Sequence, residues 1–158
     1  MILTTRGKPT KMPLKLCREA VRFYANYLLQ KRTFQNIHVE LCFSNNDLAS
    51  SDHGAAEWVD TNIRGREFLL TVRPSLGKRL MLLTLAHELI HIKQYATGEL
   101  IDYLNQPNHN KCKWKGKVYN DARSFLQYWE LPWEIEAHGR EKALYYNFLT
   151  YYALKYGK

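Results

Sequence analysis

The chain has 158 residues, of which 46% are hydrophobic, 13% aromatic and 24% charged, a composition that excludes an intrinsically disordered protein and suits one globular domain. No apolar run approaches the roughly 20 residues that span a bilayer, so we expect no membrane-spanning helix and no membrane partner. The formal net charge of +8 allows attraction to nucleic acid or to acidic proteins, although many small soluble proteins are simply basic.

The first 12 residues are basic and lack the apolar segment of a secretion signal, and we expect them to form a loose arm. The cysteines Cys17, Cys42 and Cys112 are odd in number and far apart, which argues against a disulfide framework and fits a reducing compartment. We therefore expect a single domain over residues 1–158 that is located in the cytoplasm.

Hydrophobic periodicity predicts the elements of the first half of the chain. Apolar residues at helical spacing predict a helix over 14–31, and strict alternation predicts a strand over 36–43. After a polar loop, two further strands joined by a turn are expected over 56–60 and 66–73.

The second half begins with a long helix predicted over 77–97, for which Gly98 is a suitable C-cap. Pro132 fits the first turn of another long helix that runs to about Tyr156. Between them the chain reads as irregular, apart from one strand-like patch at 113–119. The order of elements predicts an α+β fold, in which a small, mostly antiparallel sheet packs on the helix over 77–97 and an N-terminal and a C-terminal helix complete a compact domain.

The segment His87-Glu88-Leu89-Ile90-His91 matches the zinc signature H-E-x-x-H. Residues four apart lie about 40° apart around a helix, so both imidazoles can bind one Zn²⁺, while Glu88 lies beside them within reach of a metal-bound water. The opposite face of this helix is apolar and is expected to be buried; it carries Leu82, Leu85, Leu89 and Ile92.

A catalytic zinc ion usually has three protein ligands and an open position, so a third ligand is expected later in the chain. The candidates are His109, Cys112, Glu130, Glu134, Glu136 and His138. Helical geometry favours Glu134, because Glu136 lies about 200° away around the same helix, on a polar face where it can pair with Arg140. His138 and His109 remain as alternatives to Glu134.

The motif His87-Glu88-x-x-His91, followed by Glu134-Ile135-Glu136-Ala137-His138, resembles the gluzincin peptidases, in which a glutamate on a later helix completes the zinc site. Residues 66–145, with the runs HELIHIKQY, KWKGKVY and WEIEAHGRE, are also similar to small phage-encoded metallopeptidases, some of them SprT-like. The resemblance implies a zincin-like fold, a Zn²⁺ cofactor held by His87, His91 and Glu134, and a place in the cytosol of a phage host.

The chain departs from both patterns in specific positions. The aspartate that orients a zinc-bound histidine in gluzincins is His138 here. The C-x-x-C pairs of a SprT-like zinc ribbon are absent, which favours the gluzincin ligand set.

The resemblance implies hydrolysis of peptide bonds in a protein or peptide substrate. Zn²⁺ lowers the pKa of its water towards roughly 7, and Glu88 acts as the general base. Tyr145 and His138 are candidates for donors that stabilise the oxyanion. The segment Phe68–Val72 is expected to be an exposed edge strand that pairs with an extended peptide.

Two other functions compete with this one. A peptide deformylase also uses H-E-x-x-H, with an upstream cysteine that would here be Cys42. A DNA-associated or regulatory protein would instead hold its zinc ion for structural reasons. The lysine-rich run KCKWKGK could bind nucleic acid, with Trp114 stacking on a base, or form a solvated hairpin with one buried tryptophan; its lysines are Lys111, Lys113, Lys115 and Lys117.

Overall fold

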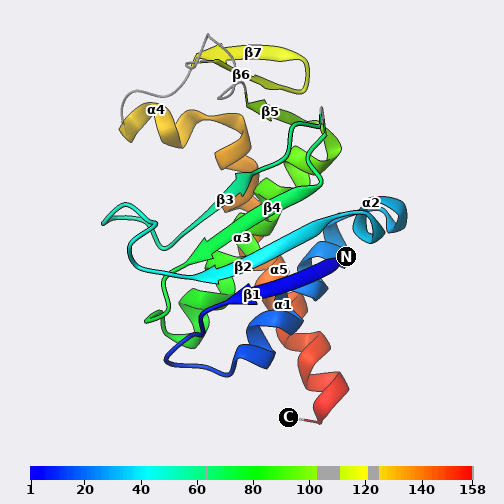
Figure 1. Cartoon of the computed structure of the whole chain (residues 1–158), viewed down its shortest axis with the longest axis vertical. Coiled ribbons are helices and arrows are strands. Elements are labelled where there is room, and N and C mark those ends of the chain that lie inside the picture. The colour runs from blue at the N-terminus through cyan, green and yellow to red at the C-terminus, as the bar shows by residue number, and fades with distance from the viewer. Residues whose placement is uncertain (63, 103–110, 121–124, 158) are drawn as a thin grey trace.

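The computed structural model describes residues 1–62, 64–102, 111–120 and 125–157. A four-stranded sheet forms one layer and the long helices lie behind it (Figure 1). In spatial order its strands are β1 (Ile2–Arg6), β2 (His38–Phe43), β4 (Glu67–Val72) and β3 (Gly54–Trp58). The helices are α1 (Leu14–Leu28), α2 (Lys31–Gln35), α3 (Lys78–Thr97), α4 (Phe125–Glu130) and α5 (Pro132–Tyr156).

This arrangement confirms the α+β class, but the strand directions in the main sheet differ from those predicted. β1 pairs with β2 and β2 with β4 in parallel, and only β3 runs antiparallel to its neighbour β4. Parallel neighbours need a crossover connection, and α1 with α2 supplies it between β1 and β2. The prediction of a mostly antiparallel sheet on α3 is therefore wrong.

The N-terminus is a strand rather than the loose arm that its composition predicted. Ile2–Arg6 pairs in register with His38–Cys42, and the Ile2 amide donates to the Ile37 carbonyl at 3.0 Å. Leu3 and Met12 are buried in the core. Leu3 is the one fully buried residue of this strand, and apolar and polar residues do not alternate along its sequence, ILTTR. The sequence therefore lacks the pattern that predicts a strand. The edge of β2 provides the hydrogen-bond partners that order it.

Helix α3 lies between the sheet and α5 and is the centre of the fold (Figure 1). Its predicted apolar face is confirmed, because Leu82, Leu85, Leu89 and Ile92 are all buried. Gly98 caps the helix with a left-handed φ of 75°, and Pro132 occupies the first turn of α5, both as predicted.

A second, smaller sheet of antiparallel strands lies beside the N-terminal end of α5; its strands are β5 (Leu100–Asp102), β6 (Lys111–Trp114) and β7 (Lys117–Asn120). β6 and β7 form the hairpin expected near 113–119. Trp114 is buried against Trp133, with ring centroids 6.3 Å apart. The hairpin with one buried tryptophan is therefore confirmed.

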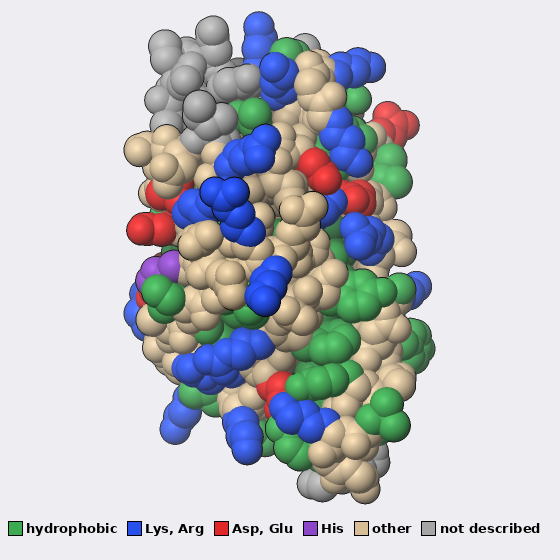
Figure 2. All heavy atoms as spheres, turned by 90° about the vertical axis from the view of Figure 1, so that its right-hand side faces the viewer, with side chains coloured by type: hydrophobic (Ala, Val, Ile, Leu, Met, Phe, Trp, Pro, Cys, Tyr) green, Lys and Arg blue, Asp and Glu red, His purple; other side chains and the backbone are tan. Residues whose placement is uncertain are grey.

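The outer surface is strongly basic on one side. Figure 2 looks at the molecule from the side on which α2 and the N-terminus lie in Figure 1, and Lys and Arg side chains are spread over this face. Among the described residues, no helix combines the length and apolar character needed to cross a membrane.

Candidate metal centre

Two imidazoles of α3 and one carboxylate of α5 converge on a single point. His87 Nε2 lies 3.1 Å from His91 Nε2, and Glu134 Oε2 lies 3.5 Å and 3.4 Å from these two nitrogens. All three residues are buried. The structure thus brings together the three residues that the sequence selected as metal ligands.

The Nδ1 atoms of the two imidazoles form hydrogen bonds on the side of each ring away from the point of convergence. His87 Nδ1 lies 2.9 Å from Glu141 Oε2, and His91 Nδ1 lies 2.9 Å from Gln94 Oε1. Because both oxygens are acceptors, each Nδ1 carries a hydrogen, and in the neutral form of each ring Nε2 keeps a lone pair directed to the common centre. Such outer hydrogen bonds fix the orientation of metal-binding histidines in proteins.

Gln94 is fully buried and has its amide orientation fixed by its own partners. Its Nε2 donates to the Trp133 carbonyl at 3.0 Å and to Glu136 Oε2 at 2.9 Å. The amide oxygen must therefore face His91. Sequence reasoning missed Gln94, although its position three residues after His91 places it on the same helix face.

The buried Glu134 carboxylate between the two imidazoles requires a positive charge nearby. Burial alone would lower the pKa of His87, but hydrogen bonds to Glu134 and Glu141 raise it to about 10. Burial likewise opposes the charged form of Glu134, yet its bonds to His87 and His91 hold the pKa of that carboxyl well below its usual range. A proton on an imidazole, or a cation shared by all three groups, satisfies this demand.

The donor set fits Zn²⁺. Two histidine nitrogens and one carboxylate oxygen are the ligand types of catalytic zinc sites. Tetrahedral coordination with bonds of about 2.0–2.2 Å places ligand atoms about 3.3–3.6 Å apart. Two of the three separations, 3.4 and 3.5 Å, fall in this range, and the third, 3.1 Å, is slightly shorter.

Glu88 lies at the edge of the same site. The metal centre opens into a pocket of about 750 Å³, which Glu88 lines together with residues from β3, α4 and α5. Burial raises the pKa of the Glu88 carboxyl above its ordinary value. Its basicity is therefore greater than that of an exposed glutamate, as a proton acceptor requires.

Tyr128 of α4 is a site residue that the sequence did not reveal. Its hydroxyl donates to Glu134 Oε2 at 2.6 Å, and its side chain lines the pocket. Burial raises the pKa of Tyr128, so the hydroxyl remains protonated. Tyr128 lies within the segment before Pro132 that reads as irregular, and nothing in the sequence connects it to Glu134.

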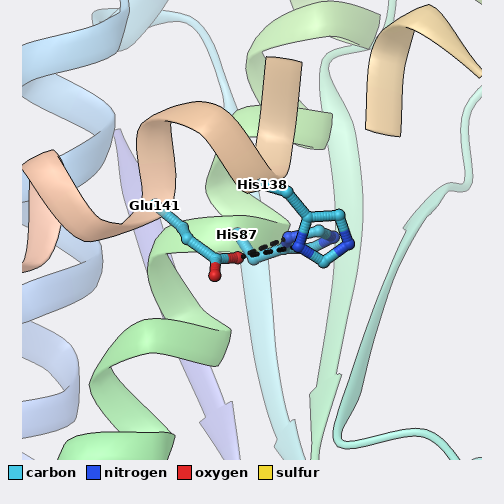
Figure 3. Close-up of side chains that lie close together, drawn as sticks. All are labelled: His87, His138 and Glu141. Carbon is cyan, nitrogen blue, oxygen red and sulfur yellow. Dashed lines mark hydrogen bonds and ion pairs between the residues drawn. The ribbon is translucent and has the colours of Figure 1, made fainter. Parts of the chain in front are cut away.

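His138 lies in the pocket wall rather than among the three converging donors. Its ring centroid is 4.5 Å from that of His87 and 4.7 Å from that of Trp129. Figure 3 shows the Glu141 carboxylate directed toward both imidazoles, 2.9 Å from His87 Nδ1 and 3.4 Å from His138 Nδ1. Burial and the charge of His87 lower the pKa of His138. The carboxylate that holds the ring of His87 in place is therefore that of Glu141.

Two residues of α5 lie in surroundings other than those expected for them. Tyr145 packs against the hydrophobic core and is not among the residues that line the pocket. It shares the angular position of Glu134, but eleven residues along a helix correspond to about 16 Å, so it lies too far along the axis. Glu136 pairs with Arg140 at 3.3 Å as predicted, but it also contacts Lys93 at 3.2 Å and is half-buried against α3 instead of facing solvent.

The remaining candidates fall outside the centre. His109 lies outside the described residues, and Cys112 and Glu130 belong to no metal-binding group among those described. Cys42 is buried in β2 and does not line the pocket, so the ligand set of a deformylase is not assembled. Phe68–Val72 lies in β4, an internal strand, and the edge strand beside the pocket is β3.

Two aromatic rings of the lysine-rich hairpin have a lysine ammonium beside them. Lys115 Nζ lies 4.7 Å from the centre of the Trp114 ring, and Lys117 Nζ lies 5.2 Å from that of Tyr119. Trp114 is buried between the hairpin and α5, so it cannot stack on a base as the alternative interpretation required.

Comparisons of the chain with protein-family models, with curated proteins and with solved structures gave no significant match.

Proposed function

We propose that this chain is a zinc-dependent hydrolase of peptide bonds, with His87, His91 and Glu134 as the metal ligands and Glu88 as the general base. The observation that carries the proposal is the convergence of two Nε2 atoms and one carboxylate oxygen within 3.5 Å of one another, while both Nδ1 atoms are hydrogen-bonded from behind. Three protein ligands leave one position open, whereas structural zinc sites usually close with four.

A bound Zn²⁺ supplies Lewis acidity that polarises the scissile carbonyl and makes water more acidic. Glu88 accepts the water proton and delivers it to the leaving amine, a role that its burial and raised pKa favour. Glu141 and Gln94 keep the two imidazoles in one tautomer. Tyr128 fixes the carboxylate of Glu134. His138 lies in the wall of the pocket with its Nδ1 toward Glu141, so the free Nε2 of the neutral ring is an acceptor and can take a hydrogen bond from the substrate.

The substrate is proposed to bind along β3. This strand lies at the edge of the sheet and, among the described residues, pairs only with β4. Gly54 and Ala56 of β3 line the pocket. A Cβ added to Gly54 would meet Thr84 Cγ2 at 2.7 Å and Glu88 Cγ at 3.2 Å, so glycine allows the strand to approach the catalytic helix closely. An extended peptide can add to this edge with its backbone beside Glu88.

Metal analysis and peptide digestion of matched variants test the proposal. The purified protein is expected to hold one zinc per chain, and His87→Ala is expected to lose both zinc and activity. Glu88→Gln is expected to keep zinc and fold but to lose on the order of 10²–10⁴-fold in turnover, because it removes a base and not a ligand. Turnover is measured by mass spectrometry on an unbiased peptide library.

Glu67→Gln is the control, because Glu67 is an exposed glutamate on β4 and should leave turnover unchanged. Wild-type turnover in Glu88→Gln would overturn the role of Glu88. Full zinc occupancy in His87→Ala would overturn the metal site itself.

A further inference from the structure

A groove of about 720 Å³ lies between α1 and the C-terminal end of α5, with Phe34 of α2 at its side. Its size is within the range of roughly 300–1,000 Å³ typical of ligand sites. None of its lining residues lines the pocket of the metal centre. Along α5, His138 and Tyr151 are thirteen residues apart, which corresponds to about 20 Å. The two cavities are therefore separate sites.

Basic side chains of α1 line this groove. Lys15, Arg18 and Arg22 follow one another at intervals of three and four residues, so they share one helix face. Arg18 is anchored by the Thr5 hydroxyl at 3.2 Å and the Leu3 carbonyl at 3.4 Å. Lys15 and Arg22 are exposed, and neither forms an ion pair with any described residue. Their charges are therefore available to an anionic ligand.

The one acidic side chain in the groove is already neutralised. Glu19 pairs with Lys155 at 2.7 Å and accepts hydrogen bonds from the hydroxyls of Tyr151 and Tyr156 at 3.3 Å and 2.9 Å. These bonds hold the two rings of α5 against α1. The positive potential of Lys15, Arg18 and Arg22 is left uncompensated.

The N-terminal part of the chain carries most of the net positive charge. Residues 1–35 contain eight Lys or Arg and one Glu, so they carry seven of the eight net positive charges. The rest of the chain is nearly neutral. Figure 2 shows the side of the molecule on which α2 and the N-terminus lie, where hydrophobic side chains gather beside Lys and Arg in the lower half. An excess of positive charge attracts polyanions.

Aromatic rings lie beside these cations. The Phe23 ring is 4.8 Å from that of Tyr151 and 6.1 Å from that of Tyr27, at interplanar angles of 30° and 29°. Tyr27 is 57% exposed and Tyr156 is 38% exposed. Tyr156 lines the groove, whereas Tyr27 lies outside its lining, next to Phe23. The groove therefore places one partly exposed tyrosine beside cations that have no ion-pair partner among the described residues.

We propose that this groove binds single-stranded nucleic acid. Phosphates would contact Lys15, Arg18 and Arg22, and an unpaired base would stack on the ring of Tyr156, which lines the groove. Charged grooves interleaved with aromatic rings bind single strands in this way, because every base has a face that can stack. In a duplex those faces are covered, so the ring favours a single strand. This binding is independent of the hydrolytic function proposed for the metal centre.

Binding of a fluorescent oligothymidylate to the full chain, followed by anisotropy, tests the proposal. We expect Lys15→Glu/Arg22→Glu to weaken binding at least tenfold and to lower the salt dependence by about 0.7 in log–log slope for each phosphate that the variant no longer neutralises. The control is Lys111→Glu/Lys117→Glu, which makes the same change in net charge on the exposed hairpin and should leave affinity within about threefold. Equal reductions of affinity in the two variants would overturn the groove as the site.

A second pair of variants tests the ring of Tyr156. Tyr156→Leu removes a stacking surface and is expected to weaken binding about 5- to 100-fold, whereas Tyr156→Phe keeps the ring and should bind like the wild type. Both variants lack the hydroxyl that donates to Glu19, so they differ only in the ring. Equal affinity of the Leu and Phe variants would overturn base stacking. Equal or tighter binding of duplex DNA, or binding of phosphatidylserine vesicles without binding of the oligonucleotide, would overturn the choice of ligand.

Discussion

At its N-terminal end α5 presents Glu134 and Glu141 to α3, whereas at its C-terminal end the same helix presents Tyr151 and Lys155 to α1. The first surface is buried, and its carboxylates are each bonded to an imidazole. The second surface is open, and it includes cations of α1 that have no ion-pair partner among the described residues.

The difference follows from solvation. A buried charge that lacks a partner is strongly destabilising, so the buried end of α5 requires a complete set of hydrogen bonds and a cation at its centre. At the open end water solvates the charges, so cations can remain unpaired and available to a ligand. Removal of one polar group should therefore have a large effect at the buried end and little effect at the open end.

The largest effect is expected at Glu134. Glu134→Ala removes a proposed metal ligand. It should weaken zinc affinity by more than the roughly 10–100-fold that follows when a ligand loses the group hydrogen-bonded to it. Glu136→Ala removes an ion-pair partner of Lys93 and Arg140 and should have a smaller effect, transmitted through Gln94. Zinc titration against a competing chelator measures both affinities. Retention of zinc by Glu134→Ala together with its loss in Glu136→Ala would reverse the assignment.

Glu141→Gln tests the outer hydrogen bond to His87. The neutral amide weakens the bond to Nδ1, and we expect zinc affinity or turnover to fall about 10–100-fold. Lys155→Ala, at the open end of the same helix, should leave both quantities unchanged. If the two variants behave alike, the contrast between the ends of α5 does not hold for the metal centre.

The pH dependence of zinc binding follows from competition with a proton. In the protein freed of metal by a chelator, the pKa of His87 is raised to about 10, so zinc must displace a proton at neutral pH. Affinity should therefore rise about tenfold per pH unit for each proton released, and level off near pH 10. Calorimetry in buffers with different ionisation enthalpies counts the protons.

The same shift predicts the stability of the metal-free fold. The pKa of His87 is higher in the folded state than its ordinary value of 6.5, so the protonated imidazole stabilises the fold fully below pH 6.5. This contribution is lost as pH rises towards 10. A metal-free protein whose thermal midpoint does not fall over this interval would contradict the prediction.

The smallest effects are expected from the two tyrosines. Tyr128→Phe removes the hydroxyl that donates to Glu134 and should weaken zinc binding by up to about tenfold, the equivalent of one hydrogen bond. Tyr145→Phe removes a hydroxyl outside the pocket and should leave binding and turnover unchanged. If Tyr145→Phe reduced zinc affinity or turnover more than Tyr128→Phe, Tyr145 and not Tyr128 would act at the site.

The sequence by itself determined the elements whose signals are local. The i and i+4 spacing of His87 and His91 on a helix places both imidazoles on one face, and the rotation between Glu134 and Glu136 selects the carboxylate that points to them. Periodicity predicted α3 and α5 together with their ends at Gly98 and Pro132, because caps and first turns depend on the backbone of a few adjacent residues.

Only the tertiary structure decided which distant groups meet. β1 is ordered by the edge of β2, and the parallel order of the main sheet depends on crossovers that periodicity does not encode. Tyr128 reaches Glu134, and Glu141 reaches His87, because α4 and α3 pack beside α5. Tyr145 shares the helix face of Glu134 but lies outside the pocket, because position along the axis as well as rotation decides contact. Angular position is a property of the helix alone, whereas contact depends on how helices are placed against one another.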